Sequence, residues 1–159
     1  LEMLRELLDA DHPMVAGALC ALAWVMIDLG RAAEAEPLAT EAAEIMTAKL
    51  GRDSEQTMLA VNARGSSLAA LGRHVEADSL ITRSLSVILP SPAIAPAFKQ
   101  RALRWAIEHC EVSGQPERAK QYREMLNRLA LPGIGSLPQA DQLQLALKPR
   151  SPHDHEIDA

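Results

Sequence analysis

The sequence predicts an all-α fold, a right-handed superhelix of about three helix pairs that follows one leading helix. The first observation is a repeat, because Leu29-Gly30-Arg31 returns 42 residues later as Leu71-Gly72-Arg73. A fixed period of about 20–50 residues indicates a solenoid, in which each unit buries its apolar face against its neighbours. The second is composition: only 3% of the 159 residues are aromatic, while alanine and leucine are abundant, which favours helices over strands.

The leading helix and the first complete repeat occupy the first third of the chain. Residues 1–10 align with the end of the next unit and predict the final helix of a preceding repeat. The chain begins without an initiator methionine, so we expect a fragment of a longer protein. In the first repeat, residues 11–52, a helix is expected to begin at Pro13, where a missing N–H costs nothing, and to end at Gly30. The second helix is predicted over 32–49.

The second repeat, residues 53–91, follows the same plan. Asp53 is expected to cap a helix over 54–71, with Gln56 three residues on as in a capping box. The partner helix is predicted over 74–89, where apolar residues again recur at helical spacing.

The third repeat, residues 92–130, is predicted as an atypical capping unit. Ser91-Pro92 is expected to open its first helix, and Gly114 separates that helix from the second. Prolines and glycines then interrupt the pattern. We therefore expect residues 131–159 to form a partly disordered tail, with a possible short helix over 139–147.

A set of residues recurs at equivalent places in the three units. They are Leu19, Leu22, Ala23, Gly30, Ala35 and Ala42 in the first, Gly65, Leu68, Gly72, Ala77 and Leu80 in the second, and Leu103, Cys110, Gly114 and Ala119 in the third. Ala23 and Gly65 are expected to be small so that the second helix of each pair can approach at Ala35 and Ala77. This plan resembles the tetratricopeptide repeat (TPR). The 42-residue period exceeds the roughly 34 residues of the common form and resembles the kinesin light chain type.

The resemblance implies a concave groove lined by the first helix of each pair. The groove positions are Cys20, Trp24, Ile27, Asp28, Leu59, Asn62, Ser66, Arg101, Arg104 and Glu108. Asn62 stands where kinesin light chain-type repeats carry an asparagine that holds a peptide backbone, a task that suits a group able to donate and accept. Cys20 and Arg104 occupy the equivalent positions, so the row of asparagines is interrupted. The alternative is that Asn62 is an ordinary polar residue of the groove.

The arginines and tryptophans admit two interpretations each. Arg101 and Arg104 could bind a ligand carboxylate. We favour the alternative that Arg104 pairs with Glu108 one turn on, while Arg101 stays solvated. Trp24 could anchor a peptide side chain, whereas Trp105 is expected to be buried between helices.

The sequence predicts no chemistry of its own. It contains no phosphate loop, no HExxH and no GxSxG, so we expect neither enzymatic activity nor a cofactor. The run His153-Asp154-His155-Glu156 lies in the proline-flanked tail, with no framework to fix metal geometry. The net charge of −5 argues against a sequence-independent nucleic-acid binder.

Location and partners follow from the same composition. No apolar run approaches the roughly 20 residues that span a bilayer, and no signal peptide is recognised, so no membrane partner is expected. Cys20 and Cys110 form no CxxC pair, which is typical of a reducing, cytoplasmic compartment.

Three functional hypotheses remain open. The first is a module that binds a peptide or partner helix in the groove, as a regulatory or scaffolding part of a larger bacterial-type signalling protein. The second is a structural spacer that self-associates through an exposed terminal helix. The third is the regulatory C-terminal region of a kinase or signalling ATPase. This repeat type serves many unrelated proteins, so fold alone does not decide among them.

Overall fold

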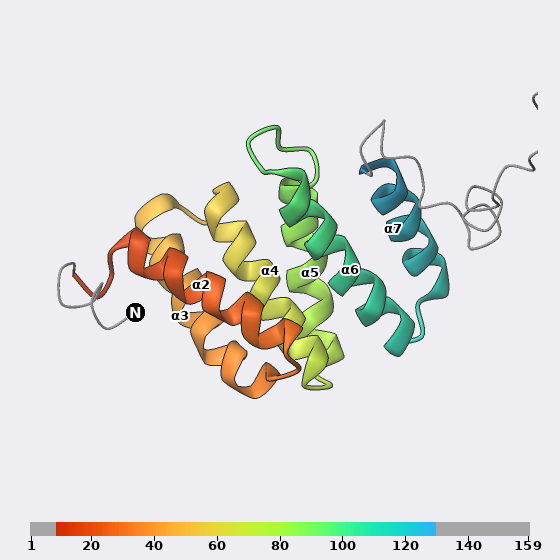
Figure 1. The fold of residues 1–159 in the computed structure, drawn as a ribbon, viewed down its shortest axis with the longest axis horizontal. Helices are drawn as coiled ribbons and strands as arrows, with labels where there is room; N and C mark the ends of the chain where they lie inside the picture. The colour runs from red at the N-terminus through yellow and green to blue at the C-terminus, as the bar shows by residue number, and fades with distance from the viewer. Residues whose placement is uncertain (1–8, 130–159) are drawn as a thin grey trace, which may run out of the picture. The chain divides into compact units, whose positions relative to one another are not determined.

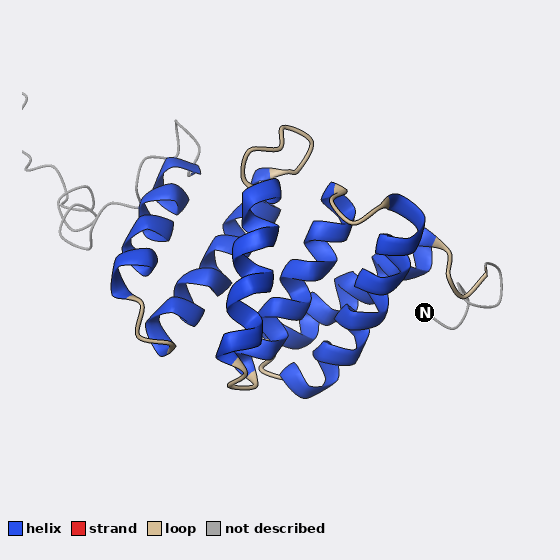
Figure 2. Cartoon of the chain, turned by 180° about the vertical axis from the view of Figure 1, so that it is seen from behind, coloured by secondary structure: helices blue, strands red, loops and turns tan. Residues whose placement is uncertain are grey.

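The computed structural model describes residues 9–129, which form six helices and no strand (Figures 1 and 2). The helices are α2 (Pro13–Asp28), α3 (Ala32–Leu50), α4 (Glu55–Ala70), α5 (His74–Ile88), α6 (Pro96–Val112) and α7 (Pro116–Leu129). The predicted all-α class is thereby confirmed. The leading helix predicted within residues 1–10 and the tail predicted over 131–159, with its short helix 139–147, lie outside the described residues.

The helices form three consecutive antiparallel pairs, α2–α3, α4–α5 and α6–α7, and each pair is joined by a short turn (Figure 1). The first helices also contact one another, α2 against α4 and α4 against α6. Within the described residues no helix is long and apolar enough to cross a membrane.

The turn inside each pair has the same hydrogen-bonded structure. Its glycine adopts a positive φ, 72° at Gly30, 78° at Gly72 and 73° at Gly114, a conformation that glycine reaches without the Cβ penalty. The residue after each glycine donates its N–H to a carbonyl five residues earlier: Arg31 to Met26 at 2.8 Å, Arg73 to Leu68 at 2.9 Å, and Gln115 to Cys110 at 2.8 Å. These bonds satisfy the terminal carbonyls of the first helices, and they recur at the 42-residue period of the sequence.

Two helices begin later than the sequence predicted. The cap of α4 is Ser54, not Asp53, and its Oγ accepts the Thr57 N–H at 3.2 Å. The third helical position is therefore Thr57, and the predicted capping box with Gln56 is absent. A capping serine satisfies one of the free N–H groups of the first turn.

The start of α6 lies at Pro96, four residues after Pro92, the predicted first residue of this helix. A proline disfavours the helical conformation of the residue before it, and Ala95 accordingly has φ −59° and ψ 143°. The preceding loop is held by Lys99, whose buried ammonium donates to the carbonyls of Leu89 at 2.9 Å and Ser91 at 2.5 Å.

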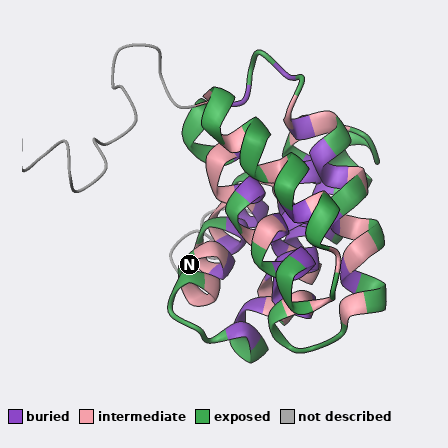
Figure 3. Ribbon diagram, turned by 90° about the vertical axis from the view of Figure 1, so that its right-hand side faces the viewer, coloured by how far each residue is buried: buried purple, intermediate pink, exposed green. Residues whose placement is uncertain are grey.

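Small residues bring the helices close together, and the buried residues lie on the faces that the helices turn toward one another (Figure 3). The larger apolar cluster belongs mainly to α2, α3 and α4 and is rich in alanine, and a smaller one joins α4, α5 and α6. At Gly65 a Cβ atom would lie 3.0 Å from Ile81 Cγ1 and 3.1 Å from Leu80 Cβ. The close approach predicted at this glycine is thus present, but it involves Leu80 and Ile81 rather than Ala77.

Candidate functional site

A cavity of about 620 Å³ lies where the glycine-turn ends of the three helix pairs meet. Its walls come from the last turns of α2, α4 and α6 and the first residues of α3 and α5. The lining residues are Ile27, Asp28, Gly30, Ala32, Ser66, Ala69, Ala70, Gly72, His74, Trp105, Glu108, His109 and Val112. A volume of this size is within the range of small-ligand sites, about 300–1,000 Å³.

Three buried polar atoms of the lining residues have no hydrogen-bond partner in the structure. They are Ser66 Oγ, His74 Nδ1 and His109 Nδ1, and Arg64 Nε, away from the cavity, is the fourth such atom among the described residues. The two imidazole rings are neighbours, with centroids 5.5 Å apart. Buried polar groups in folded proteins are nearly always hydrogen-bonded to protein or ordered water. These three atoms have almost no solvent-accessible surface, so they lie beneath the surface of the cavity and do not open into it.

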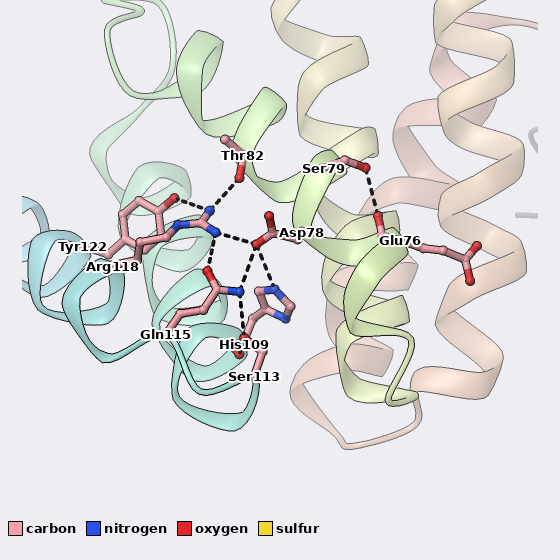
Figure 4. Close-up of polar contacts among 9 residues, drawn as sticks. All are labelled: Glu76, Asp78, Ser79, Thr82, His109, Ser113, Gln115, Arg118 and Tyr122. Atoms are coloured by element: carbon pink, nitrogen blue, oxygen red, sulfur yellow. Dashed lines mark hydrogen bonds and ion pairs between the residues drawn. The ribbon is translucent and has the colours of Figure 1, made fainter.

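The ring of His109 is held from behind by Asp78 of α5 (Figure 4). Asp78 Oδ1 lies 3.3 Å from His109 Nε2. An ionised carboxylate only accepts hydrogen bonds, so Nε2 donates, and in the neutral imidazole Nδ1 then carries the lone pair. In the neutral ring the contact thus leaves the lone pair on His109 Nδ1, a buried atom.

Asp78 is in turn fixed by α7 and the turn before it (Figure 4). Its Oδ1 accepts from Arg118 Nη1 at 2.6 Å and from Gln115 Nε2 at 3.4 Å, while Arg118 Nη2 donates to Thr82 Oγ1 at 2.7 Å. Partial burial acts to raise the pKa of Asp78. The hydrogen bond and charge of Arg118, with smaller contributions from Gln115 and His109, outweigh it and lower that pKa below its usual range.

A second, much smaller cavity adjoins Trp105, and an arginine forms part of its wall. It is lined by Trp24, Leu59, Asn62, Phe98, Arg101, Ala102 and Trp105. The Arg101 guanidinium lies 5.5 Å from the ring centroid of Trp24 and 5.9 Å from that of Trp105, and it pairs with Asp28 at 3.6 Å. Arg101 therefore ties α6 to α2 through cation–π contacts and an ion pair. Arg101 thus has partners that were not expected, while its side chain remains 37% exposed.

Most of the predicted groove residues line one of these two cavities. Ile27, Asp28, Ser66 and Glu108 line the larger one, and Trp24, Leu59, Asn62 and Arg101 the smaller. Arg104 is exposed and lines neither. The ion pair expected between Arg104 and Glu108 is not present among the described residues. Trp105 is only half-buried, because it forms a wall of both cavities.

Two of the predicted positions are corrected by their burial. Cys20 is 3% exposed and belongs to the apolar core, and this burial raises the pKa of its thiol to about 12. Asn62 is 2% exposed, and its Nδ2 donates to Ser84 Oγ of α5 at 2.9 Å. Its amide thus joins two helices, which an ordinary groove residue open to a peptide would not do.

The two histidines of the cavity were not among the predicted site residues. His74 lies 42 residues after Ala32. Ala32 and His74 are each the first residue of the second helix of a pair, and each lines the cavity. This equivalence was the available signal. The described residues contain no group of three or more histidine, cysteine or acidic side chains placed to hold a metal ion. The predicted His153–Glu156 cluster lies outside them. No protein-family model matches the chain, and no curated protein matches it either.

Proposed function

We propose that residues 11–129 form a right-handed superhelix of the TPR type and bind a partner peptide or helix along α2, α4 and α6. Support comes from the three helix pairs, from their equivalent glycine turns, and from the contacts of each first helix with the next. This row of first helices supplies most of the walls of both cavities.

The observation that carries the proposal is the larger cavity, whose lining residues come from α2, α4 and α6 and from the starts of α3 and α5. Exposed apolar side chains border it, since Val112 lines it and Leu29 and Leu71 follow lining residues directly in the chain. They are 68%, 63% and 42% exposed. Exposed apolar side chains that gather on one surface mark candidate partner-binding sites.

Binding rather than catalysis is the activity that these groups support. Ser66 and the two histidines line the same cavity, yet the Ser66 hydroxyl has no hydrogen bond to either ring. A nucleophilic serine needs a base within hydrogen-bond reach. The outer face of α7 is polar, as expected of a terminal unit, which favours the interaction module over self-association through this helix.

The proposal extends to the setting of the module. Cys20 and Cys110 are both buried free thiols, which suits a reducing, cytoplasmic compartment. A module of this kind would serve as the regulatory or scaffolding part of a larger signalling protein.

A peptide-display selection against the whole chain tests the proposal, followed by titration of the selected peptides. Ala70→Trp places a large ring in the cavity wall from an exposed position. It should weaken binding at least about tenfold, or about 1.4 kcal/mol. Ala48→Trp is the matched control, an exposed helical alanine of α3 that lines neither cavity, and it should bind like the wild type.

A second variant separates a binding role from a structural one. Val112→Ala shortens a cavity-lining side chain that is 68% exposed, so the melting temperature should hardly change, while the affinity for the selected peptides should fall. Equal affinity of wild type and Ala70→Trp for every selected peptide would overturn the proposal.

A further inference from the structure

Side chains connect the two outer helices of the row α2, α4 and α6. Both outer helices contact α4, but the backbones of α2 and α6 do not contact each other. The rings of Trp24 in α2 and Phe98 in α6 nevertheless lie against each other, with centroids 5.1 Å apart. The Arg101 guanidinium of α6 lies 5.5 Å from the centroid of the Trp24 ring and 3.6 Å from the Asp28 carboxylate of α2. We call these four residues the α2–α6 bridge.

Two side chains of α4 share a cavity with this bridge. Leu59 and Asn62 line the smaller cavity together with Trp24, Phe98 and Arg101. The volume of this cavity is about 10 Å³, which is at the lower limit for holding one water molecule, about 10–15 Å³. Asn62 is only 2% exposed. While it is closed, the bridge therefore leaves no room for a peptide chain beside Asn62.

The contacts that hold the bridge closed are exposed to solvent. Phe98 is 37% exposed, and the side chains of Arg101 and Asp28 are 37% and 48% exposed. Ion pairs and cation–π contacts at such positions are weak, and Arg101 makes no hydrogen bond with another described residue. The apolar clusters that join the helices include none of these three residues. The bridge can therefore open while the helix pairs stay folded.

We infer that the α2–α6 bridge regulates access to α4: it covers Leu59 and Asn62 in the free protein, and a partner segment that crosses α4 must displace Arg101. The inference rests on the proposed function, because it concerns how the partner reaches the row of first helices. A protein whose binding-competent state is only partly populated binds with an affinity reduced by that fraction. Removing Arg101 should therefore strengthen binding, whereas removing a residue that contacts the partner would weaken it.

The test titrates the peptides selected by display into the whole chain and into its Arg101→Ala variant. The variant should bind about three- to tenfold more tightly, since the bridge no longer has to be opened. Phe98→Ala, which removes the ring that faces Trp24, should change the affinity in the same direction. Arg104→Ala is the matched control, because Arg104 is exposed on the same helix, lines neither cavity and belongs to no ion pair among the described residues. Its affinity should equal that of the wild type.

A structural measurement separates opening of the bridge from a general gain in affinity. In the free wild type a nuclear Overhauser effect is expected between the Trp24 and Phe98 rings, whose centroids are 5.1 Å apart, and it should disappear when peptide saturates the chain. Equal or weaker binding by Arg101→Ala, or persistence of this signal in the complex, would each overturn the inference. If Ala70→Trp still weakens the same peptides, the proposed function stands and only the regulatory bridge fails. A chain that binds none of the displayed peptides would overturn both.

Discussion

The two sides of the larger cavity are built by different chemistry. On the side of α2, α3 and α4 the helices are joined by an apolar core in which alanines predominate, including Ala23, Ala35 and Ala39 at 0% exposure. On the side of α5, α6 and α7 a smaller apolar cluster is supplemented by the hydrogen bonds that converge on Asp78.

The difference shows that apolar packing mainly stabilises the fold, whereas the hydrogen bonds to Asp78 also orient a side chain of the cavity. Close packing of small side chains fixes the distance between helices whatever the pH or salt, because dispersion and burial do not depend on charge. Hydrogen bonds around a carboxylate also fix the orientation of His109, but only while the carboxylate is ionised. The packing of the apolar side should therefore be independent of pH. The polar side, which carries Trp105, Glu108 and His109, should depend on pH through the ionisation of Asp78.

The largest effect is expected from Leu19→Ala on the apolar side. Leu19 is 0% exposed within the larger cluster, so its truncation leaves a cavity and should lower the free energy of unfolding by about 2–5 kcal/mol. Urea unfolding followed by circular dichroism measures it. Leu29→Ala is the control, because Leu29 is 63% exposed, and it should change stability by less than about 0.5 kcal/mol. Similar losses in both variants would contradict the assigned core.

An intermediate effect is expected when two helical glycines are compared. In α2, a Cβ on Gly17 would meet no atom within 4 Å, so Gly17→Ala should stabilise the protein by up to about 1 kcal/mol through helix propensity. In α4, a Cβ on Gly65 would meet Leu80 and Ile81 at 3.0–3.2 Å. Overpacking should offset the same gain, leaving Gly65→Ala less stable than Gly17→Ala. Thermal unfolding of the two variants side by side decides, and the reverse order would contradict the close contact with α5.

The smallest effect is expected on the polar side. Asp78 is 37% exposed at its side chain, so solvent screens its ion pair with Arg118 and Asp78→Asn should cost only about 1 kcal/mol at neutral pH. The folded pKa of Asp78 is lowered. Its contribution is therefore present above the unfolded pKa of about 3.9 and is lost as the pH falls through the folded pKa.

The pH dependence supplies the control for that prediction. The difference between wild type and Asp78→Asn should shrink when urea unfolding is repeated at about pH 3, because below the unfolded pKa of about 3.9 the unfolded state binds a proton that the lowered folded pKa resists. Glu124→Gln should show no difference at either pH. A difference for Asp78→Asn that is constant with pH would show that its charge does not stabilise the α5–α7 junction.

The helices and turns could be predicted from the sequence because their signals are local. Apolar spacing marks each helix, and Gly30, Gly72 and Gly114 mark the positive φ of each turn. The start of α6 could not, because three prolines offered competing boundaries. The loop before it depends on Lys99 reaching back to Leu89 and Ser91.

The candidate site was predictable only in part, for a physical reason. The alignment of the repeats at their closing glycines predicted groove positions at Ile27 and Asp28 of α2 and at Glu108 of α6, and all three residues line the cavity. Burial depends on the neighbouring helix, so the hydrogen bond of Asn62 to Ser84 could not be foreseen from α4 alone. The role of His109 likewise depends on Asp78, which lies 31 residues away in the chain.

The lining of the larger cavity runs from Ile27 to Val112 and so draws on all three helix pairs. In a repeat protein each unit interacts only with its neighbours, and unfolding can begin at either end. A ligand held by all three pairs adds its binding free energy to the stability of the whole array, because it binds only when all three pairs are folded. Binding would therefore couple the unfolding of the three helix pairs more tightly, so that saturation with ligand should sharpen the unfolding transition as well as raise its midpoint.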